Sequence, residues 1–412
     1  FLDITVPVIL GDQVTTEAGT GCVHTAPGHG EDDFNVGRRY NLEVAVPVDH
    51  YGKFTPDAGP YAGAKAVQSN PQIVADLHAS GHLLSDPSDD LEHSYPHHSR
   101  CGRPLLFRAT DQWFLSMAHE QLRERCLDAI EGVDWVPDWG QRRIHAMVSA
   151  RPDWCLSRQR LWGVPIIAFH CGDCGEVNVN ADWIDHVAAQ FDAQNSDVWY
   201  AQEASDLLPK GAACSACESS DLRKDGDILD VWFDSGVSYV ANGFDQAPVD
   251  LYLEGSDQHR GWFHTSLLAS VATRDRAPYR AALTHGFVVD GRGHKLSKSK
   301  KNFTPVHQVI EKSGAELIRL WAASADYRED IRVSDEILKR TADSYRKLRN
   351  TLRFLLGNLA GFDPARDAVS DDQLRPLDRV ILADVDAFVA RMDEAYSRYQ
   401  FHQAMQAVSE FC

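Results

Sequence analysis

The chain has 412 residues, of which 43% are hydrophobic and 25% are charged, and its formal net charge is −19. The length predicts more than one domain, and the composition is ordinary for a globular protein in water. No apolar run approaches the roughly 20 residues that span a bilayer. The opening ten residues carry an acid and no basic leader and are too short for a signal peptide. The negative charge argues against a general nucleic-acid coat, although it is compatible with a local basic face. We therefore expect a cytoplasmic protein with no membrane partner.

The first 92 residues are predicted to form a β-rich region with short helices. The chain opens without an initiating Met, inside a stretch that resembles a strand, so we expect an internal fragment of a longer protein. Residues 19–34 then combine Gly, His and Asp in a turn-rich segment. His24, His29 and Asp33 carry side chains that suit a metal site, a hydrolytic site or a hydrogen-bonded loop.

Residues 93–110 are predicted to cross from this region to the next one. His98 and Cys101 have the spacing of metal ligands, but two ligands do not close a zinc site. We therefore expect a surface turn here. From Thr110 to Phe169 the pattern changes to the mixed character of an α/β domain.

Four cysteines form two Cys-x-x-Cys pairs, Cys171 with Cys174 and Cys214 with Cys217. In a cytosolic enzyme such pairs favour a metal over disulfides. Two knuckles separated by a loop match a zinc ribbon, in which four thiolates surround Zn²⁺ and leave no position open for chemistry. We therefore predict a structural zinc site, with the polar stretch 192–210 as the loop between the knuckles.

Two polar stretches are typical of a ligand site in an α/β protein. In the first, 250–263, an apolar strand leads into Glu, Gly, Asp and Gln and then into a helix. Open parallel sheets bind ligands at such carboxyl ends of strands. The second, 295–299, reads Lys-Leu-Ser-Lys-Ser and lies between an apolar run and a helical pattern. Its lysines and hydroxyls suit a polyphosphate, although it lacks the glycines of a Walker loop and by itself is also compatible with a solvated turn.

After about Tyr327 the chain is predicted to be helical. Ser334, followed by two acids, is a plausible N-cap. An apolar stripe then recurs at three- and four-residue steps, which predicts one buried helix face: Leu338, Tyr345, Leu348, Leu352, Leu355 and Leu359. Basic residues lie seven apart beside the stripe, and they form either a solvated face or a nucleic-acid contact: Lys339, Arg346 and Arg353.

Together with 227–236, Asp-Ile-Leu-Asp-Val-Trp-Phe-Asp-Ser-Gly, the two polar stretches resemble the class I aminoacyl-tRNA synthetases, and among them the isoleucine-specific family. The lysine stretch is similar to the second signature loop of the class, usually Lys-Met-Ser-Lys-Ser. Leu296 replaces the Met, a change that conserves volume. Lys301 stands where Gly is usual, which bears on the closed shape of the loop.

The resemblance covers nearly the whole chain and implies an α/β fold, namely the second half of a class I Rossmann-like nucleotide-binding domain with a zinc-ribbon insertion. It implies the C-terminal part of a β-rich editing domain over 1–92. The catalytic domain would span 93–326, with the insertion at about 170–218. The start of a helical anticodon-binding domain would span 327–412.

The activity implied by the resemblance is that of an isoleucine–tRNA ligase, acting as a monomer on isoleucine, ATP with Mg²⁺, and tRNA(Ile). The implied phosphate-binding catalytic residues are Lys298 and Lys295. The residues that contact the aminoacyl-adenylate would be Glu254, Gly255, Asp257 and Gln258, and the aromatic walls of the amino-acid pocket would be Trp232 and Trp262. Arg158 and Arg160, in the stretch 153–165, either face the acceptor stem of the tRNA or pair with carboxylates inside the fold.

An editing activity is also implied, in which valine mischarged onto the tRNA is hydrolysed. In the family, the residue matching Asp33 holds the α-ammonium group and the one matching His24 lies beside the scissile ester. A second sieve is needed because one missing methylene changes binding only modestly, an argument for which this enzyme family is the standard example. The threonine-rich part of the family's editing site is absent from these residues.

The first signature of the class, of the His-Ile-Gly-His type, is also absent from these residues. We therefore predict that the fragment alone does not form adenylate at a normal rate. Two other functions remain open. One is a valyl-tRNA synthetase of the same class, and the other is a zinc-ribbon module that binds nucleic acid without chemistry. The central spatial prediction is that Glu254 and Lys298 close over one nucleotide.

Overall fold

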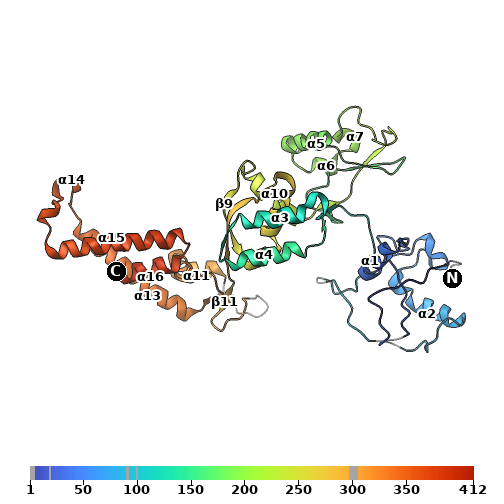
Figure 1. Cartoon of the computed structure of the whole chain (residues 1–412), viewed down its shortest axis with the longest axis horizontal. Helices are drawn as coiled ribbons and strands as arrows, with labels where there is room; N and C mark the ends of the chain where they lie inside the picture. The colour runs from blue at the N-terminus through green and yellow to red at the C-terminus, as the bar shows by residue number, and fades with distance from the viewer. Residues whose placement is uncertain (1–4, 18–19, 90–91, 99–100, 297–304) are drawn as a thin grey trace. The chain divides into compact units, whose positions relative to one another are not determined.

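The structure is a computed structural model that describes residues 5–17, 20–89, 92–98, 101–296 and 305–412. The chain divides into two compact units, residues 1–112 and 113–412 (Figure 1). None of the described helices has both the length and the hydropathy to cross a bilayer.

The first unit contains short helices joined by long irregular segments. They are α1 (Glu31–Arg39), η1 (Pro56–Tyr61), η2 (Ala66–Gln68) and α2 (Asn70–Ala79). The prediction of a β-rich region is wrong for the described residues of this unit, which contain only isolated bridges such as Val48 with Phe54. An extended segment becomes a strand only when a neighbour accepts its backbone hydrogen bonds. Val6, Val8 and Leu10 belong to no described strand, and their side chains are largely exposed.

The second unit is organised around a parallel sheet with the strand order β2–β10–β9. Its strands are β2 (Asp134–Val136), β9 (Val249–Gly255) and β10 (Tyr279–His285). Helices α3 (Leu122–Glu131), α4 (Trp139–Ser149) and α10 (Trp262–Arg274) pack with the sheet around one hydrophobic core. Every residue of α10 from Phe263 to Val271 is buried. This is the mixed α/β architecture that the sequence predicted.

Shorter elements connect this core to the segment 169–224, which we call the insertion. They are β1 (Phe114–Leu115), η3 (His119–Gln121), β3 (Trp154–Cys155), β4 (Ser157–Arg158), β8 (Ile228–Leu229), α8 (Val231–Gly236), α9 (Ser238–Ala241) and η4 (Ser256–Arg260). Strands β1 and β3 pair antiparallel, as do β4 and β8. The second pair places Arg158 next to the strand that leads into α8.

The insertion has a small core of its own. Three antiparallel strands, in the order β6–β5–β7, carry it: β5 (Phe169–Cys171), β6 (Val177–Asn178) and β7 (Leu222–Lys224). Helices α5 (Ala181–Gln194), α6 (Val198–Ala201) and α7 (Ala204–Leu207) complete it. The prediction of a plain loop over 192–210 is wrong, because Val198, Trp199 and Leu207 are buried in this core. Three apolar residues among polar ones are enough to anchor two short helices.

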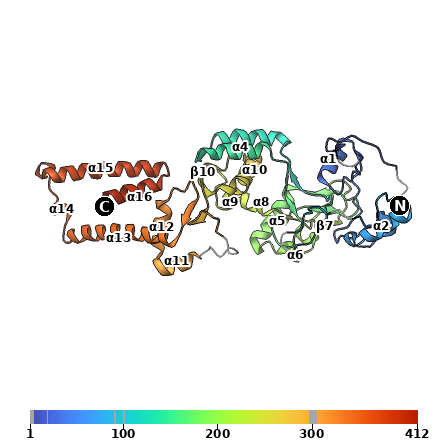
Figure 2. The same ribbon diagram turned by 90° about the horizontal axis from the view of Figure 1, so that it is seen from below.

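The C-terminal part joins the core through a second parallel strand pair, β11 (Val288–Asp290) with β12 (Ile331–Val333). Its helices are α11 (Val306–Ser313), α12 (Ala315–Ser324), α13 (Asp335–Asn358), α14 (Pro364–Asp367), α15 (Pro376–Ser397) and α16 (Phe401–Phe411), with η5 at Asp371–Gln373. Helix α16 lies between α13 and α15 (Figures 1 and 2). Strand β12 was not expected in a region predicted to be helical.

Ser334 caps α13 as predicted, with its hydroxyl accepting a hydrogen bond from the backbone N–H of Ile337 at 3.3 Å. The predicted apolar stripe of α13 is only partly buried. Tyr345 and Leu348 are half-buried, whereas Leu352, Leu355 and Leu359 are about half exposed. Among the described residues, α12 packs against α13. The C-terminal half of the apolar stripe is less well covered.

Candidate functional site

The carboxyl ends of β9 and β10 lie side by side, because Gly255 pairs with His285 in the parallel register. Glu254 is the second-last residue of β9, and its carboxylate lies 3.8 Å from the Nε2 atom of His285, the last residue of β10. The same carboxylate accepts the backbone N–H of Gly255 at 3.0 Å. Its side chain is 49% exposed, so it can still receive a ligand's cationic group.

The turn after β9 carries the next three predicted residues. Gly255 is buried, and a Cβ there would lie 2.8 Å from Oδ1 of Asp257, so a side chain at this position would displace the Asp257 carboxylate. Gln258 donates from its Nε2 to Asp257 at 3.2 Å and accepts the backbone N–H of Trp262 through its Oε1 at 2.9 Å. The side-chain oxygen of Gln258 thus satisfies a free donor in the first turn of α10.

Trp262 forms a fixed wall beside this turn. Its ring stacks on Tyr252 of β9 with centroids 4.0 Å apart and planes 13° apart. Its indole N–H donates to the hydroxyl of Ser238 at 3.1 Å. Strand β9 and helix α9 therefore both hold the indole in place.

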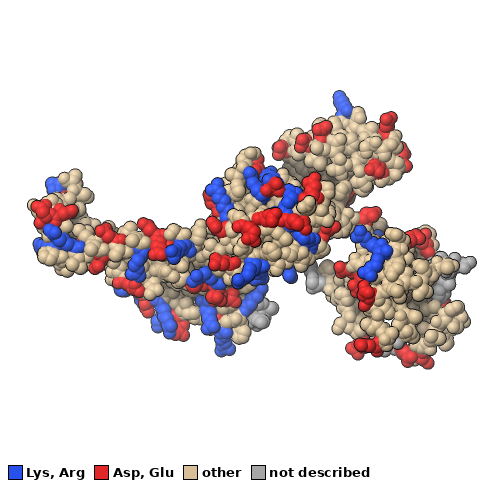
Figure 3. Space-filling view, in the orientation of Figure 1, with Lys and Arg blue, Asp and Glu red and all other residues tan. Residues whose placement is uncertain are grey.

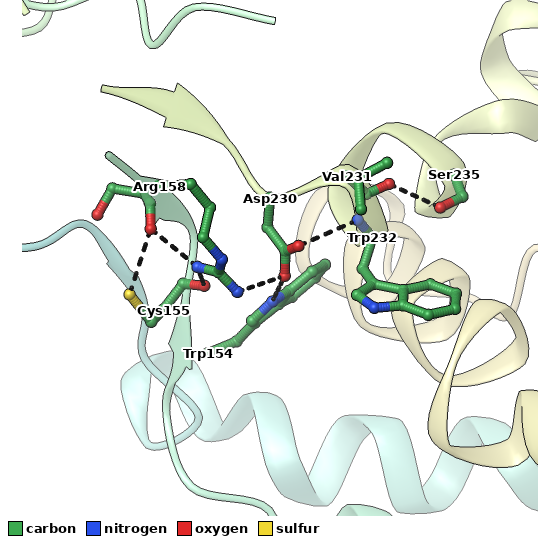
Figure 4. A network of polar contacts seen from close by, with 8 residues as sticks. Trp154, Cys155, Arg158, Asp230, Val231, Trp232 and Ser235 are labelled. Atoms are coloured by element: carbon green, nitrogen blue, oxygen red, sulfur yellow. Dashed lines mark hydrogen bonds and ion pairs between the residues drawn. The ribbon is translucent and has the colours of Figure 1, made fainter. Parts of the chain in front are cut away.

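Trp232, in α8, also lies beside this turn, with its ring against Gly261. Asp230, at the N-cap of α8, accepts the backbone N–H of Trp232 at 3.3 Å, while its other oxygen accepts Nε1 of Trp154 at 3.0 Å and pairs with Arg158 at 2.8 Å. Figure 4 shows this carboxylate between the guanidinium group and the start of the helix, with the indole of Trp232 pointing away from it. Of the two alternatives for Arg158, the ion pair inside the fold is the one observed.

Two buried histidines, His259 and His264, back the site. Burial lowers the pKa of His259 to about 4 and that of His264 to about 3. His259 lies against the rings of Trp135 and Trp139, and its Nδ1 is 3.1 Å from the carbonyl oxygen of Ser256. Both imidazoles are therefore neutral near pH 7, and His259 ties the polar turn to the core.

The lysine stretch begins beside β11, the strand that follows β10. Lys295 bridges to Val289 of β11, and its ammonium lies 5.2 Å from the ring centre of Phe287, two residues after the end of β10. This contact is a cation–π interaction. Lys298 lies outside the described residues, as do Lys301 and Asn302. The predicted closure of Glu254 and Lys298 over one nucleotide therefore stays a prediction.

The four cysteines of the insertion come together. The sulfur atoms of Cys171, Cys174, Cys214 and Cys217 all lie within 4.8 Å of one another, and among the described residues they form the one group of three or more side chains able to hold a metal. The backbone N–H of Ala216 donates to Cys214 and is the main reason that the pKa of this thiol falls to about 6. The N–H of Cys174 likewise lowers the pKa of Cys171. Donors aimed at sulfur favour the thiolate that a metal requires.

In the first unit, the predicted editing residues belong to one loop and helix start. Asp33, in the first turn of α1, accepts the backbone N–H of Ala26 at 2.9 Å, and His29 contacts the carbonyl oxygen of Phe107 at 2.9 Å. His24 is exposed. These contacts fit the alternative of hydrogen-bonded loop residues, and Asp33 and His24 keep their editing roles as predictions. His98 and Cys101 are both exposed, and the backbone N–H of Cys101 donates to Nδ1 of His98 at 3.3 Å.

Basic side chains gather over the C-terminal part, as Figure 3 shows around α11 and α13. Lys339, Arg346 and Arg353 are exposed on α13. Acidic neighbours on the same helix partner some of its cations, Glu336 with Arg340 at 2.5 Å and Asp343 with Arg346. The pairs reduce the local positive charge without removing it.

Sequence reasoning missed three residues that shape the site: Asp230, Gly261 and His285. Asp230 could have been found, because an Asp before a short helical pattern is a typical N-cap. Gly261 and His285 have no comparable signal. Their importance comes from contacts with Trp232 and Glu254, which only the folded chain brings near.

Comparison with known proteins gives one family. The family model described as "tRNA synthetases class I (I, L, M and V)" matches residues 30–334. Curated isoleucine–tRNA ligases of Syntrophotalea carbinolica and Geobacter sulfurreducens are 53% and 50% identical to the chain. Both matches cover all of this chain and 45% of the relative, so the chain spans about half the length of these relatives.

Among solved structures, the crystal structure of Mycobacterium tuberculosis methionyl-tRNA synthetase bound by methionyl-adenylate matches with a TM-score of 0.50 and 16% identity. The match covers 94% of this chain and 73% of that one. At this identity the likeness concerns the fold alone.

Proposed function

The chain belongs to the class I tRNA synthetase family of the isoleucine, leucine, methionine and valine group, and from this premise we propose that it is part of an isoleucine–tRNA ligase. The observation that carries the proposal is identity of about 50% to isoleucine–tRNA ligases along the entire chain. Because the chain spans 45% of their length, the activity proposed is that of the whole protein. It would act in the cytoplasm, where its tRNA and ATP are found, and as a monomer.

In the proposed reaction the carboxylate of isoleucine attacks the α-phosphate of ATP and pyrophosphate leaves. The acyl group then passes from this adenylate to the terminal ribose of tRNA(Ile), and AMP leaves. Glu254 would receive the ammonium group of the amino acid, and its half-exposed carboxylate supports that role. Asp257, Gln258 and the tight turn at Gly255 would line the ribose and the adenylate. Trp232 and Trp262 would wall the side-chain pocket, where flat apolar surfaces suit a branched aliphatic group.

Lys298 and Lys295 would neutralise the charge that develops on the leaving pyrophosphate, together with Mg²⁺. For Lys295, the support is its place next to the end of β10. The basic face of α13 would contact the tRNA, whose phosphates attract exposed cations. The domain limits that go with this proposal are 1–92, 93–326 and 327–412.

Zn²⁺ would be held by Cys171, Cys174, Cys214 and Cys217. The four sulfurs fit a closed tetrahedral site, and the N–H donors aimed at Cys171 and Cys214 fit thiolate ligands. When bound, the ion would stabilise the insertion and take no part in the reaction. Its ligands come from both ends of the insertion, so it would tie those ends together.

Hydrolytic editing of mischarged valine would belong to the first unit. Asp33 would hold the α-ammonium of the mischarged amino acid, and His24 would orient a water molecule or the terminal ribose. The exposure of His24 leaves it accessible to a ligand.

The test is pyrophosphate exchange by the full-length protein that contains this chain. We expect exchange that depends on isoleucine and is much weaker with valine. Lys298→Ala should lower the rate by about 10²–10³, as expected when one charge-stabilising group is removed. Lys312→Ala, an exposed lysine on α11, is the matched control and should leave the rate unchanged.

Other outcomes point to other functions. Exchange that is faster with valine would indicate a valine enzyme of the same class. Nucleic-acid binding without any exchange, indifferent to Lys298→Ala, would indicate a zinc-ribbon binding module.

A further inference from the structure

A buried carboxylate, that of Asp230, positions Trp232 by accepting a hydrogen bond from its backbone N–H. Asp230 is 5% exposed and accepts hydrogen bonds from three groups: the backbone N–H of Trp232, the indole of Trp154 and the guanidinium of Arg158. Arg158 is fixed in turn, because its Nη1 donates to the carbonyl oxygens of Cys155 and Ser157 at 2.8 Å each. A buried carboxylate with three donors has little freedom to move, so it fixes the first turn of α8.

The outer edge of the Trp232 ring is positioned by a glycine. A Cβ on Gly261 would lie 2.5 Å from Oε1 of Gln258, 2.9 Å from Cη2 of Trp232 and 3.0 Å from Cζ3 of Trp232, so a side chain there would displace both the amide and the ring. Carbon atoms in contact prefer separations of about 3.5–4.0 Å. The indole therefore lies directly against the backbone of Gly261, and any side chain there would displace it by about half an ångström or more.

The backbone contact also brings the two aromatic walls together, since Gly261 is the residue immediately before Trp262. Trp262 is held by stacking and by a side-chain hydrogen bond. Trp232, by contrast, is 42% exposed, and its ring depends on the start of α8 and on the absence of a side chain at Gly261. The width of a pocket between the two indoles is thus set by residues that need not touch the ligand.

We propose that Gly261 and the Asp230–Arg158 pair are positioning residues for amino-acid selection: they fix the Trp232 indole at the start of α10 and so set the pocket to a branched aliphatic side chain. This inference rests on the proposed function. Selection between isoleucine and valine depends on one methylene, so a wall displaced by a fraction of an ångström weakens it. ATP binding, which uses the strand ends and the lysine stretch, should be unaffected by a change at Asp230, whose hydrogen bonds do not include them.

The first experiment compares Gly261→Ala with Gly226→Ala in the full-length protein. Gly226 has nothing within 4 Å of an added Cβ and an ordinary φ, so it is the matched control. We measure isoleucine- and valine-dependent pyrophosphate exchange. Gly261→Ala should raise the KM for isoleucine about tenfold and lower the isoleucine-to-valine ratio of kcat/KM about tenfold. The KM for ATP should stay within about twofold in Asp230→Asn, a variant that leaves Gln258 untouched.

A second experiment separates positioning from a general structural role. Trp232→Phe removes the outer ring atoms that approach Gly261, so Gly261→Ala should cost less in that background than in the unmodified protein. The two effects are then not additive, as expected for residues in contact. Asp230→Asn, a variant that leaves Gly261 intact, should shift the isoleucine KM in the same direction by a smaller factor.

The outcomes are distinguishable. Equal isoleucine KM values and ratios for Gly261→Ala and Gly226→Ala, or strictly additive effects with Trp232→Phe, would overturn the inference. If Gly261→Ala does not fold, a normal isoleucine KM in Asp230→Asn would overturn it just as well. Lack of isoleucine-dependent exchange by the unmodified protein would instead defeat the proposed function, and this inference with it.

Discussion

The four-cysteine cluster and the strand-end site hold their side chains in different ways. In the cluster, Cys171 and Cys214 are buried in a separate small core, Cys174 and Cys217 are exposed, and backbone N–H groups point at sulfur. At the strand ends, Glu254 and Trp232 are about half exposed. Their order comes from backing residues such as Asp230, His285 and Gly261, and the latter two carry no motif.

The difference follows from what each site does. A closed metal site has to exclude competing ligands, and here two of its four cysteines, Cys171 and Cys214, are also part of a core. A site for a small substrate has to stay open, and its side chains are therefore positioned from behind. This contrast predicts that damage to the cluster is structural, whereas damage behind the open site changes selectivity first.

The largest expected effect is loss of the metal from the insertion. Cys214→Ser removes a buried ligand, and in small zinc domains the ion contributes binding free energy on the order of 10 kcal/mol. We expect zinc content to fall from one ion per chain to none, and the amides of β5 and β7 to lose hydrogen-exchange protection. Protection of β9 and β10 should persist, because the two cores are separate.

Cys22→Ser is the matched control, since Cys22 is an exposed cysteine outside the cluster. It should keep the zinc and the exchange pattern of the unmodified protein. Zinc retained in Cys214→Ser would show that the cluster is not the metal site.

An intermediate effect is expected from the histidines behind the open site. His264 is neutral in the folded chain, with a pKa of about 3 that burial lowers from the ordinary 6.5. Between these two values the unfolded state binds more protons than the folded state, so the free energy of unfolding falls as the pH falls below about 6.5. His264→Leu should therefore make the dependence of Tm on pH shallower between about pH 6.5 and pH 5.

His307→Gln, on the exposed face of α11, should leave that slope unchanged. Acid-induced loss of zinc affects all variants alike and cancels in the comparison. An unchanged slope in His264→Leu would mean that this histidine does not link stability to pH.

The same contrast explains what the sequence could predict. The Cys-x-x-Cys spacing predicted the cluster because ligands of a closed site come in short, regular steps. The strand-end residues Glu254 to Gln258 could be placed because a strand-to-helix change is visible in the pattern. Two contacts could not be predicted in this way. Gly255 pairs with His285, 30 positions along the chain, and Gly261 contacts Trp232, 29 positions away, and no local pattern reveals such distant partners. The β-rich region was overpredicted for a related reason, since strand formation depends on a neighbour that local pattern does not reveal.

The smallest effect tests how far the open site depends on its neighbours. Ser334 caps α13, and its Cβ lies 3.3 Å from where a Cβ on Gly291 would be, in the turn that leads from β11 to Lys295. Ser334→Ala removes the cap and should lower the local stability of α13 by about 1 kcal/mol. The adjoining strand β12, and β11 that pairs with it, should then open more often. The amides of Asp290 and Ile331, which bond to His294 and Phe287 at 2.9 Å and 2.8 Å, should then exchange about fivefold faster.

Ser344→Ala is the control. Ser344 lies farther along α13, where its hydroxyl makes a long hydrogen bond of 3.4 Å to the carbonyl oxygen of Arg340, and its removal should not change the exchange rates of those two amides. The amides of the insertion should be unchanged in both variants. Faster exchange in the insertion would contradict the view that the cluster is self-contained. Unchanged exchange at Asp290 would mean that β10 and β11 alone hold the lysine stretch in place. The stability of α13 would then have no effect on the proposed phosphate-binding lysines.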